Sequence, residues 1–359
     1  MAVNSSTLAE GVRPRTISLR WIISGRDDLI WMIGSVSVSY VLLILYSSGR
    51  IRLLPMMAGW AVLVDGPHVF GTWSRTYFDK SEWIKRKRLL LGSLLFFAVG
   101  PLAVLSGYAL GFFFFAAVWA YYHLVKQHYG FMVLYKKKNN DLAKMDNALD
   151  RVFLLLAFTS PFLNYIASDA EAMTHVPVAL QAGIKTLAVA VMAATIAVFI
   201  AWILRQIQRL VMGMPLDMPK YLLLAAAIPM HWIVLGTTMP YKPIALVAIL
   251  TVYHNLQYHR LIWFHNKKYS VGDDARKRFG AAAVINRSLF TYVGFALLFG
   301  LLYQGPRQYI LGREVTSMTS WVVILTSFLW GFAFNHYYLD SKIWRVRRDP
   351  SVGKALKME

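Results

Sequence analysis

Long apolar runs, separated by short polar or basic segments, dominate the pattern of this chain. A helix needs roughly 20 apolar residues to cross the hydrocarbon core of a bilayer, which is about 30 Å thick. The pattern predicts ten such spans, at 28–48, 52–74, 88–107, 109–135, 148–168, 183–208, 219–238, 242–265, 284–304 and 318–341. The sequence therefore predicts an all-α protein, a polytopic transmembrane helix bundle of about ten spans.

Composition supports a membrane setting and narrows the chemistry. Hydrophobic residues make up 57% of the 359 residues and charged residues only 16%, which is far more apolar than a soluble domain. The first apolar run is too long and too late for a cleaved signal peptide, so we expect it to stay on the chain. Cysteine is absent, which excludes disulfides, iron–sulfur clusters and thiolate-ligated haem. Any metal must therefore bind nitrogen and oxygen.

The net charge of +20 is distributed in alternate loops. The basic segments are 13–26, 75–88, 136–144, 205–220, 267–278 and 342–348, whereas 168–181 has acids and no base. Cytoplasmic loops of membrane proteins carry such an excess of Lys and Arg, so membrane topology explains the charge better than nucleic-acid binding does. We expect a cytoplasmic N-terminal segment (1–27), a transmembrane domain (28–341) and a basic cytoplasmic tail (342–359). In a bacterium the membrane would be the cell inner membrane.

Seven of the nine histidines fall near the predicted cytoplasmic ends of even-numbered spans, together with two aspartates. Ionisable groups at membrane depth are costly and usually functional. The predicted metal ligands are Asp65, His68, His123, His128, His254, His259, His265, His336 and Asp340. Nine ligands suit two metal ions better than one. Imidazole and carboxylate together favour iron, with zinc or another transition metal as alternatives.

The spacing of these residues supports a shared site. Asp65 and His68 are three residues apart and His336 and Asp340 four apart, so each pair shares a helix face. The two Tyr-His-x4-His stretches place their histidines about 140° apart on a regular helix. His265 reaches the same site only if its helix has ended and the chain turns back.

Polar side chains near these ligands are candidates for hydrogen-bond partners of the ligands. They are Gln127, Tyr122, Tyr253, Tyr258, Asn255, Asn335 and Tyr337, although an aromatic belt at the headgroups explains the tyrosines equally well. Trp73, Arg75 and Asp79 follow His68 and are candidates for covering the site. We expect His175 to be a solvated loop residue. For His231 we expect an interhelical hydrogen bond, with substrate contact as the alternative.

The two His-x4-His stretches resemble the first box of the histidine-box membrane oxygenases, a family of desaturases and hydroxylases. The adjacent His-His pair of that family's later boxes is absent. Pro67-His68 and the pair His336 and Asp340 are more loosely similar to Brp/Blh-type carotenoid-cleaving dioxygenases. The first resemblance implies a non-haem diiron centre and O2-dependent hydroxylation or desaturation of a lipid-like substrate, with no catalytic residues beyond the metal ligands. The second implies oxidative cleavage.

No phosphate-binding glycine motif is present, so we expect no nucleotide cofactor. A desaturase-like enzyme of this kind would take electrons from a separate protein such as a ferredoxin or rubredoxin. The stretches KKKNNDLAK (136–144) and RRDP (347–350) offer basic surface for it, although topology alone also explains them. Two other classes stay open. A metal or proton-coupled transporter would need polar residues through the outer half of the spans, and that half is nearly free of them. A haem protein with bis-histidine ligation would leave several histidines and both aspartates without a role.

Overall fold

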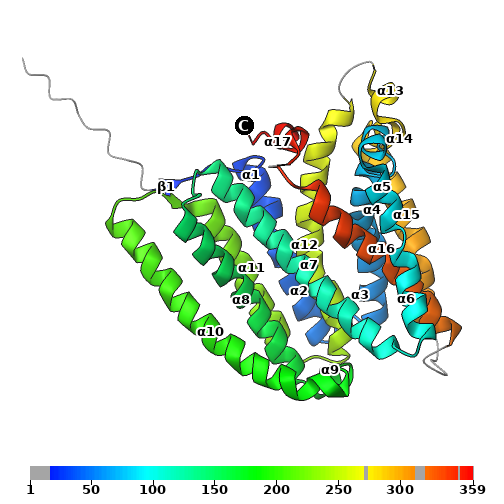
Figure 1. Ribbon diagram of the computed structural model, residues 1–359, viewed down its shortest axis with the longest axis horizontal. Helices are drawn as coiled ribbons and strands as arrows, with labels where there is room; N and C mark the ends of the chain where they lie inside the picture. The colour runs from blue at the N-terminus through cyan, green and yellow to red at the C-terminus, as the bar shows by residue number, and fades with distance from the viewer. Residues whose placement is uncertain (1–16, 271–273, 312–319, 347, 359) are drawn as a thin grey trace, which may run out of the picture.

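Helices form nearly all of the computed structural model, which describes residues 17–270, 274–311, 320–346 and 348–358 (Figure 1). The longer ones are α2 (Val36–Ser47), α5 (Lys80–Ser93), α6 (Phe96–Leu105), α7 (Ala109–Lys138), α8 (Lys144–Ser168), α10 (Val178–Val211), α11 (Met218–Gly236), α12 (Lys242–Asn266), α15 (Leu289–Leu311) and α16 (Trp321–Ile343). Shorter pieces are α1 (Gly25–Asp27), α3 (Leu53–Trp60), α4 (Gly66–Arg75), α9 (Ala170–Thr174), α13 (Ala275–Phe279), α14 (Ala281–Ile285) and α17 (Pro350–Ala355). Two π-helical segments, η1 (Asp28–Gly34) and η2 (Ala61–Asp65), and a 3-10 turn, η3 (Lys267–Ser270), complete the helical elements. The all-α prediction is confirmed.

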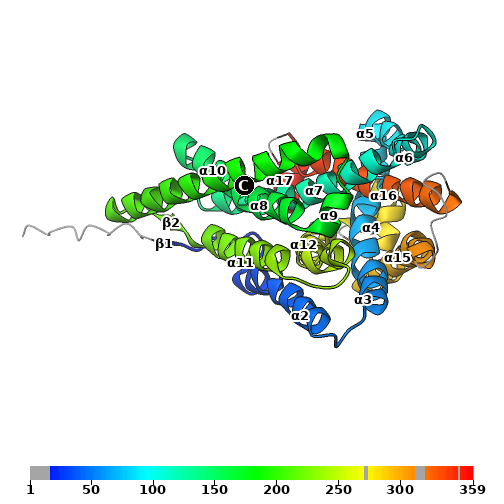
Figure 2. The same cartoon turned by 90° about the horizontal axis from the view of Figure 1, so that it is seen from below.

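Nine helical runs in the described ranges are long and apolar enough to cross a membrane. The predicted eighth span corresponds to α12, a 25-residue helix whose many polar residues keep it outside those nine. Seen from below, α12 lies inside the bundle, and it packs against α2, α4, α7 and α11 (Figure 2). A helix enclosed by others can carry polar groups that a lipid-facing helix cannot. The start of the predicted tenth span and the first sixteen residues lie outside the described part.

Both described ends of the chain lie at one end of the bundle. The two-residue strand β1 (Ile17–Ser18) pairs in parallel with β2 (Leu216–Asp217) there, and α17 lies at the same end (Figure 1). Helix α9 lies at the opposite end. This arrangement agrees with an even number of crossings. Which end faces the cytoplasm stays a prediction.

Close glycine contacts hold the helix that carries His68. A Cβ on Gly66 would lie 2.4 Å from Gly300 Cα, and a Cβ on Gly300 would lie 2.5 Å from the Val62 carbonyl oxygen. Neither distance is possible for a real side chain, so α4 and α15 meet backbone to backbone at these glycines. The helix run from α3 through η2 to α4 is thereby fixed against α15, and the direction of His68 is fixed with it.

A buried ion-pair network joins α7, α8, α10 and α11 near β2. Lys220 contacts Asp141 (2.7 Å) and Asp150 (3.0 Å), and Lys136 also pairs with Asp150. Arg209 contacts Asp141 at 3.0 Å. Buried charges of this kind are tolerated because each has a partner of opposite sign. Lys136, the first residue of the basic KKKNNDLAK stretch, is therefore inside the protein rather than on its surface.

Candidate metal centre

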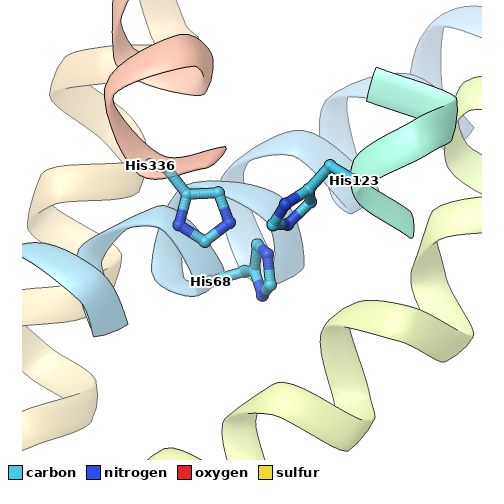
Figure 3. A group of neighbouring side chains, drawn as sticks. All are labelled: His68, His123 and His336. Carbon is cyan, nitrogen blue, oxygen red and sulfur yellow. The ribbon is translucent and has the colours of Figure 1, made fainter. Parts of the chain in front are cut away.

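Three histidines from three different helices converge inside the bundle. His68 comes from α4, His123 from α7 and His336 from α16, and each offers a ligand atom within 4.8 Å of the other two (Figure 3). All three residues are buried. We call this group the histidine triad. Three nitrogens with this spacing are able to hold a transition metal ion.

A fourth histidine, His254 of α12, adjoins the triad. Its ring centroid lies 4.8 Å from that of His68 and 5.1 Å from that of His123. His336 lies 4.5 Å from His68 and 4.9 Å from His123, measured in the same way. Two imidazoles on one metal, each about 2.1 Å from it, have centroids at most roughly 6.5 Å apart. These separations all lie inside that limit.

Each of these four rings has a buried nitrogen without a hydrogen-bond partner in the described part of the chain. The atoms are His68 Nδ1, His123 Nε2, His254 Nδ1 and His336 Nε2. Leaving one buried polar atom unsatisfied costs about 1–3 kcal/mol. Four such atoms in one place call for a common partner, and neutral imidazole is the side chain that most often binds metal ions in proteins. The residues present therefore fit a metal.

The protein fixes the orientation of His336 through Thr72 and Asp340. The Thr72 hydroxyl donates to Asp340 Oδ1 (2.6 Å), so its oxygen accepts from Nδ1–H of His336 (2.7 Å). Tyr258 also donates to Asp340 Oδ1 (2.9 Å). This chain holds the proton on Nδ1 and leaves Nε2 with its lone pair, as partners of metal-bound histidines do. Asp340 thus lies behind His336, and its assignment as a direct ligand stays a prediction.

The π-helical segment η2 lies directly before α4, the helix that carries His68. Segments of this type often occur at functional sites. Its last residue, Asp65, accepts hydrogen bonds from Gln304 Nε2 (2.6 Å) and Asn255 Nδ2 (3.5 Å). His259 Nε2–H donates to the carbonyl of Val64 at 3.0 Å, and the His259 ring lies 6.2 Å from that of His68. Both residues border the triad, and their assignment as metal ligands stays a prediction.

Two other predicted ligands have different neighbours. His128 contacts His231, at 5.8 Å between ring centroids, and donates from Nδ1 to the Leu124 carbonyl. His265 is hydrogen-bonded to Asn266 and lies 5.4 Å from the ring of Trp344. His265 was expected to reach the site only if the chain turned back before it. Helix α12 continues to Asn266, so the chain does not turn back there.

Helix bounds give the positions of two of these histidines along their helices. Fourteen residues of α7 precede His123 and fifteen follow it. His254 likewise has twelve residues of α12 on either side. The two histidines therefore lie halfway along their helices rather than at an end, because both helices continue past the histidine stretches.

The predicted hydrogen-bond partners are only partly gathered at the triad. Tyr258 lies 4.6 Å from the His68 ring, and Tyr337 stacks on His123 at 4.3 Å. Gln127 donates to the His254 carbonyl (2.7 Å). The remaining four have other surroundings. Asn255 donates to Asp65, and Tyr253 donates to the Met32 carbonyl and lies beside His128. Asn335 donates to Tyr77 and Ser93, and Tyr122 is exposed.

The residues expected to cover the site form separate contacts instead. Trp73 packs against Tyr77, Phe299 and Phe332. Arg75 donates to the Ile343 carbonyl and lies over the ring of Trp344. Asp79 caps the N-terminus of α5 and accepts a hydrogen bond from Tyr269. His175 is exposed beside α9, as expected for a solvated loop residue. His231 makes the expected interhelical hydrogen bond, with Tyr121 of α7.

Sequence reasoning missed Thr72, Gln304 and the contact between His231 and His128. Thr72 lies four residues after His68 and therefore on the same helix face, which is a signal that the sequence did contain. Gln304 lies in the predicted ninth span, far from any histidine in the chain. Its contact with Asp65 depends on the α4–α15 packing and has no local signal.

Comparison with protein-family models finds no match, and comparisons with curated proteins and with solved structures find none either. The chain is a helical, multi-pass membrane protein with a buried three-histidine cluster. The likeness to histidine-box oxygenases stays a resemblance of short motifs.

Proposed function

We propose that this protein is a membrane-embedded, non-haem iron oxygenase that hydroxylates or desaturates a hydrophobic, lipid-like substrate. The observation that carries the proposal is the group of buried, unpartnered imidazole nitrogens contributed by α4, α7, α12 and α16. A transporter would need polar groups along a path across the membrane. The clustering of the histidines at one depth supports an enclosed site instead.

The role of the chain in this proposal is to hold and shield the metal. His68, His123 and His336 would be its ligands, with His254 next to them, and Thr72 and Asp340 would keep His336 in the tautomer that binds. Bound iron would supply the activation of dioxygen. The buried setting of the triad excludes bulk water, which protects a reactive centre from side reactions. We propose two iron ions per chain, because the predicted ligands exceed what one ion takes. Zinc or another transition metal is the alternative.

An apolar groove supports a hydrophobic substrate. It lies among α7, α8 and α10, has a volume of about 480 Å³, and is lined by side chains such as Phe114, Phe162 and Leu187. Volumes of about 300–1,000 Å³ are typical of small-molecule sites. Tyr121 forms part of the lining and also contacts His231, so one wall of the groove adjoins a histidine outside the triad. A lipid-like molecule would enter it laterally, from the membrane.

Electron supply gives the test of this function. The chain has no cysteine for an iron–sulfur centre and no dinucleotide-binding motif, so a hydroxylase or desaturase of this type depends on a donor protein. We expect iron-loaded protein in liposomes to form product from acyl lipids, sterols or carotenoids only when ferredoxin or rubredoxin and a reductase are added. Mass spectrometry of the lipid extract measures the product.

Two controls make the result decisive. His336→Ala should abolish product formation, whereas His175→Ala, at an exposed position, should leave it unchanged. Sustained turnover without any donor would contradict the hydroxylase and desaturase proposal and support carotenoid-type cleavage. Metal movement across the liposome membrane, without product, would support the transporter.

A further inference from the structure

A second groove lies where α5 and α6 meet α16. Its volume is about 350 Å³, and its lining includes Arg88, Gly92, Leu95, Val99 and Tyr338. A Cβ on Gly92 would meet nothing within 4 Å, so the missing side chain helps to keep the groove open. Leu95 and Val99 are exposed, in a helical run that is long and apolar enough to cross a membrane. The groove therefore faces the lipid.

The lining residues from α5 and α6 form a stripe along the groove. Arg88, Gly92, Leu95 and Val99 follow one another at intervals of four, three and four residues, which places them on one helix face. At 1.5 Å per residue, the distance from Arg88 to Val99 is roughly 16 Å. One leaflet, half of a hydrocarbon core of about 30 Å, has nearly the same depth. The stripe is charged at one end and apolar over the rest of that depth.

The charged end of the groove lies at the end of the bundle that carries α17. Lys85 and Arg86, just before Arg88, contact Asp349 at the N-terminus of α17, at 2.8 and 2.7 Å. Both of these cations thus have an acidic partner. Arg88 is exposed, and it has no ion pair or side-chain hydrogen bond among the described residues. Its guanidinium is therefore free to contact a ligand in the groove.

A second cation lies beside the groove. Tyr338 is part of the lining, and Lys342 Nζ lies 5.1 Å from the centroid of the Tyr338 ring. Lys342 has no ion pair in the described part of the chain. The two cations belong to the basic segments 75–88 and 342–348, both of which are predicted to be cytoplasmic. Anionic lipids of the cytoplasmic leaflet attract Lys and Arg near the surface, by about 1 kcal/mol each.

We propose that this groove binds one anionic phospholipid of the cytoplasmic leaflet. Its phosphate contacts Arg88 and Lys342, and an acyl chain lies along Leu95 and Val99. A guanidinium binds two phosphate oxygens through parallel hydrogen bonds, which suits Arg88 to this ligand. A free phosphate ion would make no use of the apolar part of the groove, and a lipid without net charge would make little use of the two cations. The proposal does not depend on the oxygenase activity or on a bound metal.

The test is native mass spectrometry of the delipidated protein in detergent, titrated with phosphatidylglycerol, which is anionic, or with phosphatidylcholine, which has no net charge. We expect one phosphatidylglycerol per chain to bind at least about fivefold more tightly than phosphatidylcholine, the factor that corresponds to about 1 kcal/mol. Arg88→Gln should weaken phosphatidylglycerol binding about fivefold. Gly92→Leu should block it, because the leucine side chain would fill the groove while both cations remain. Both variants change exposed positions, so they should unfold at the native temperature without lipid.

Lys87→Gln is the matched control, because it removes the same charge from an exposed neighbour of Arg88 that does not line the groove. It should bind phosphatidylglycerol as tightly as the native protein does. Equal weakening in Lys87→Gln and Arg88→Gln, or native affinity in Gly92→Leu, would overturn the proposal, because general surface charge would then account for the binding. Equal affinity of the native protein for the two lipids would overturn it as well.

Discussion

Thr72 is the residue on which the orientation of His336 most directly depends. Its hydroxyl joins Nδ1 of His336 to the Asp340 carboxylate, at 2.7 and 2.6 Å. We expect Thr72→Val, which removes the hydroxyl and keeps the shape, to weaken metal binding by roughly 10–100-fold, the usual effect of losing such a partner. Chelator competition measures the affinity.

Thr72→Ser is the matched control, since serine keeps the hydroxyl. It should bind metal with nearly the native affinity. Equal affinity for native protein and Thr72→Val would mean that the hydrogen-bond chain behind His336 does not support a metal ligand.

At the scale of elements, the α4–α15 contact holds His68 in place. Gly300→Ala would place a Cβ 2.5 Å from the Val62 carbonyl oxygen, and the helices would have to separate. We expect a loss of about 1–3 kcal/mol of stability, as for other overpacked sites. The measurement is thermal unfolding of the protein in detergent.

Gly294, in the same helix α15, offers a matched control because a Cβ there meets nothing within 4 Å. Gly294→Ala should leave stability unchanged or raise it slightly, given the better helix propensity of alanine. If both variants have the same midpoint, close α4–α15 packing is contradicted.

The start of α11 gives a prediction for pH. Asp217 caps this helix by accepting from the Lys220 backbone N–H (3.2 Å), and its Oδ2 has no partner within the described residues. Burial raises the pKa of Asp217 from 3.8 to about 6. A raised pKa in an acid means that the folded protein holds the proton more tightly than the unfolded chain. Its contribution to stability is therefore greatest below pH 4 and is lost as pH rises through 6.

Asp217→Asn keeps the cap and removes the cost of ionisation. We expect this variant to be more stable than native protein at pH 8, by at most about 3 kcal/mol, and equally stable near pH 4. Asp169→Asn, which changes the less buried cap of α9, should have little effect at either pH. A destabilised Asp217→Asn at pH 8 would indicate that the folded protein stabilises the ionised carboxylate, which contradicts a raised pKa.

At the scale of the whole molecule, the sequence predicted the helices well because a span needs only about 20 apolar residues in a row. Even α12, with three histidines, matched the predicted range of 242–265 closely. The convergence of histidines from several spans was also predictable, because they share a depth. His68, His123, His254 and His336 do meet.

The partition of the histidines between neighbouring groups was not predictable. His128 is five residues from His123 and therefore turns about 140° away from it, toward α11 and His231. Which helix lies on that side is decided by tertiary contacts between α7 and α11, such as the hydrogen bond between Tyr121 and His231, which are 110 positions apart. No local pattern in a single sequence reports such a pairing.

The central claim is that the histidine triad binds a metal ion, and anomalous X-ray diffraction at the iron edge from crystals of iron-loaded protein tests it most directly. We expect a peak enclosed by the rings of His68, His123 and His336, and no Soret band from haem in the same preparation. Iron-loaded crystals without a peak at the triad, or a haem spectrum, would contradict the account.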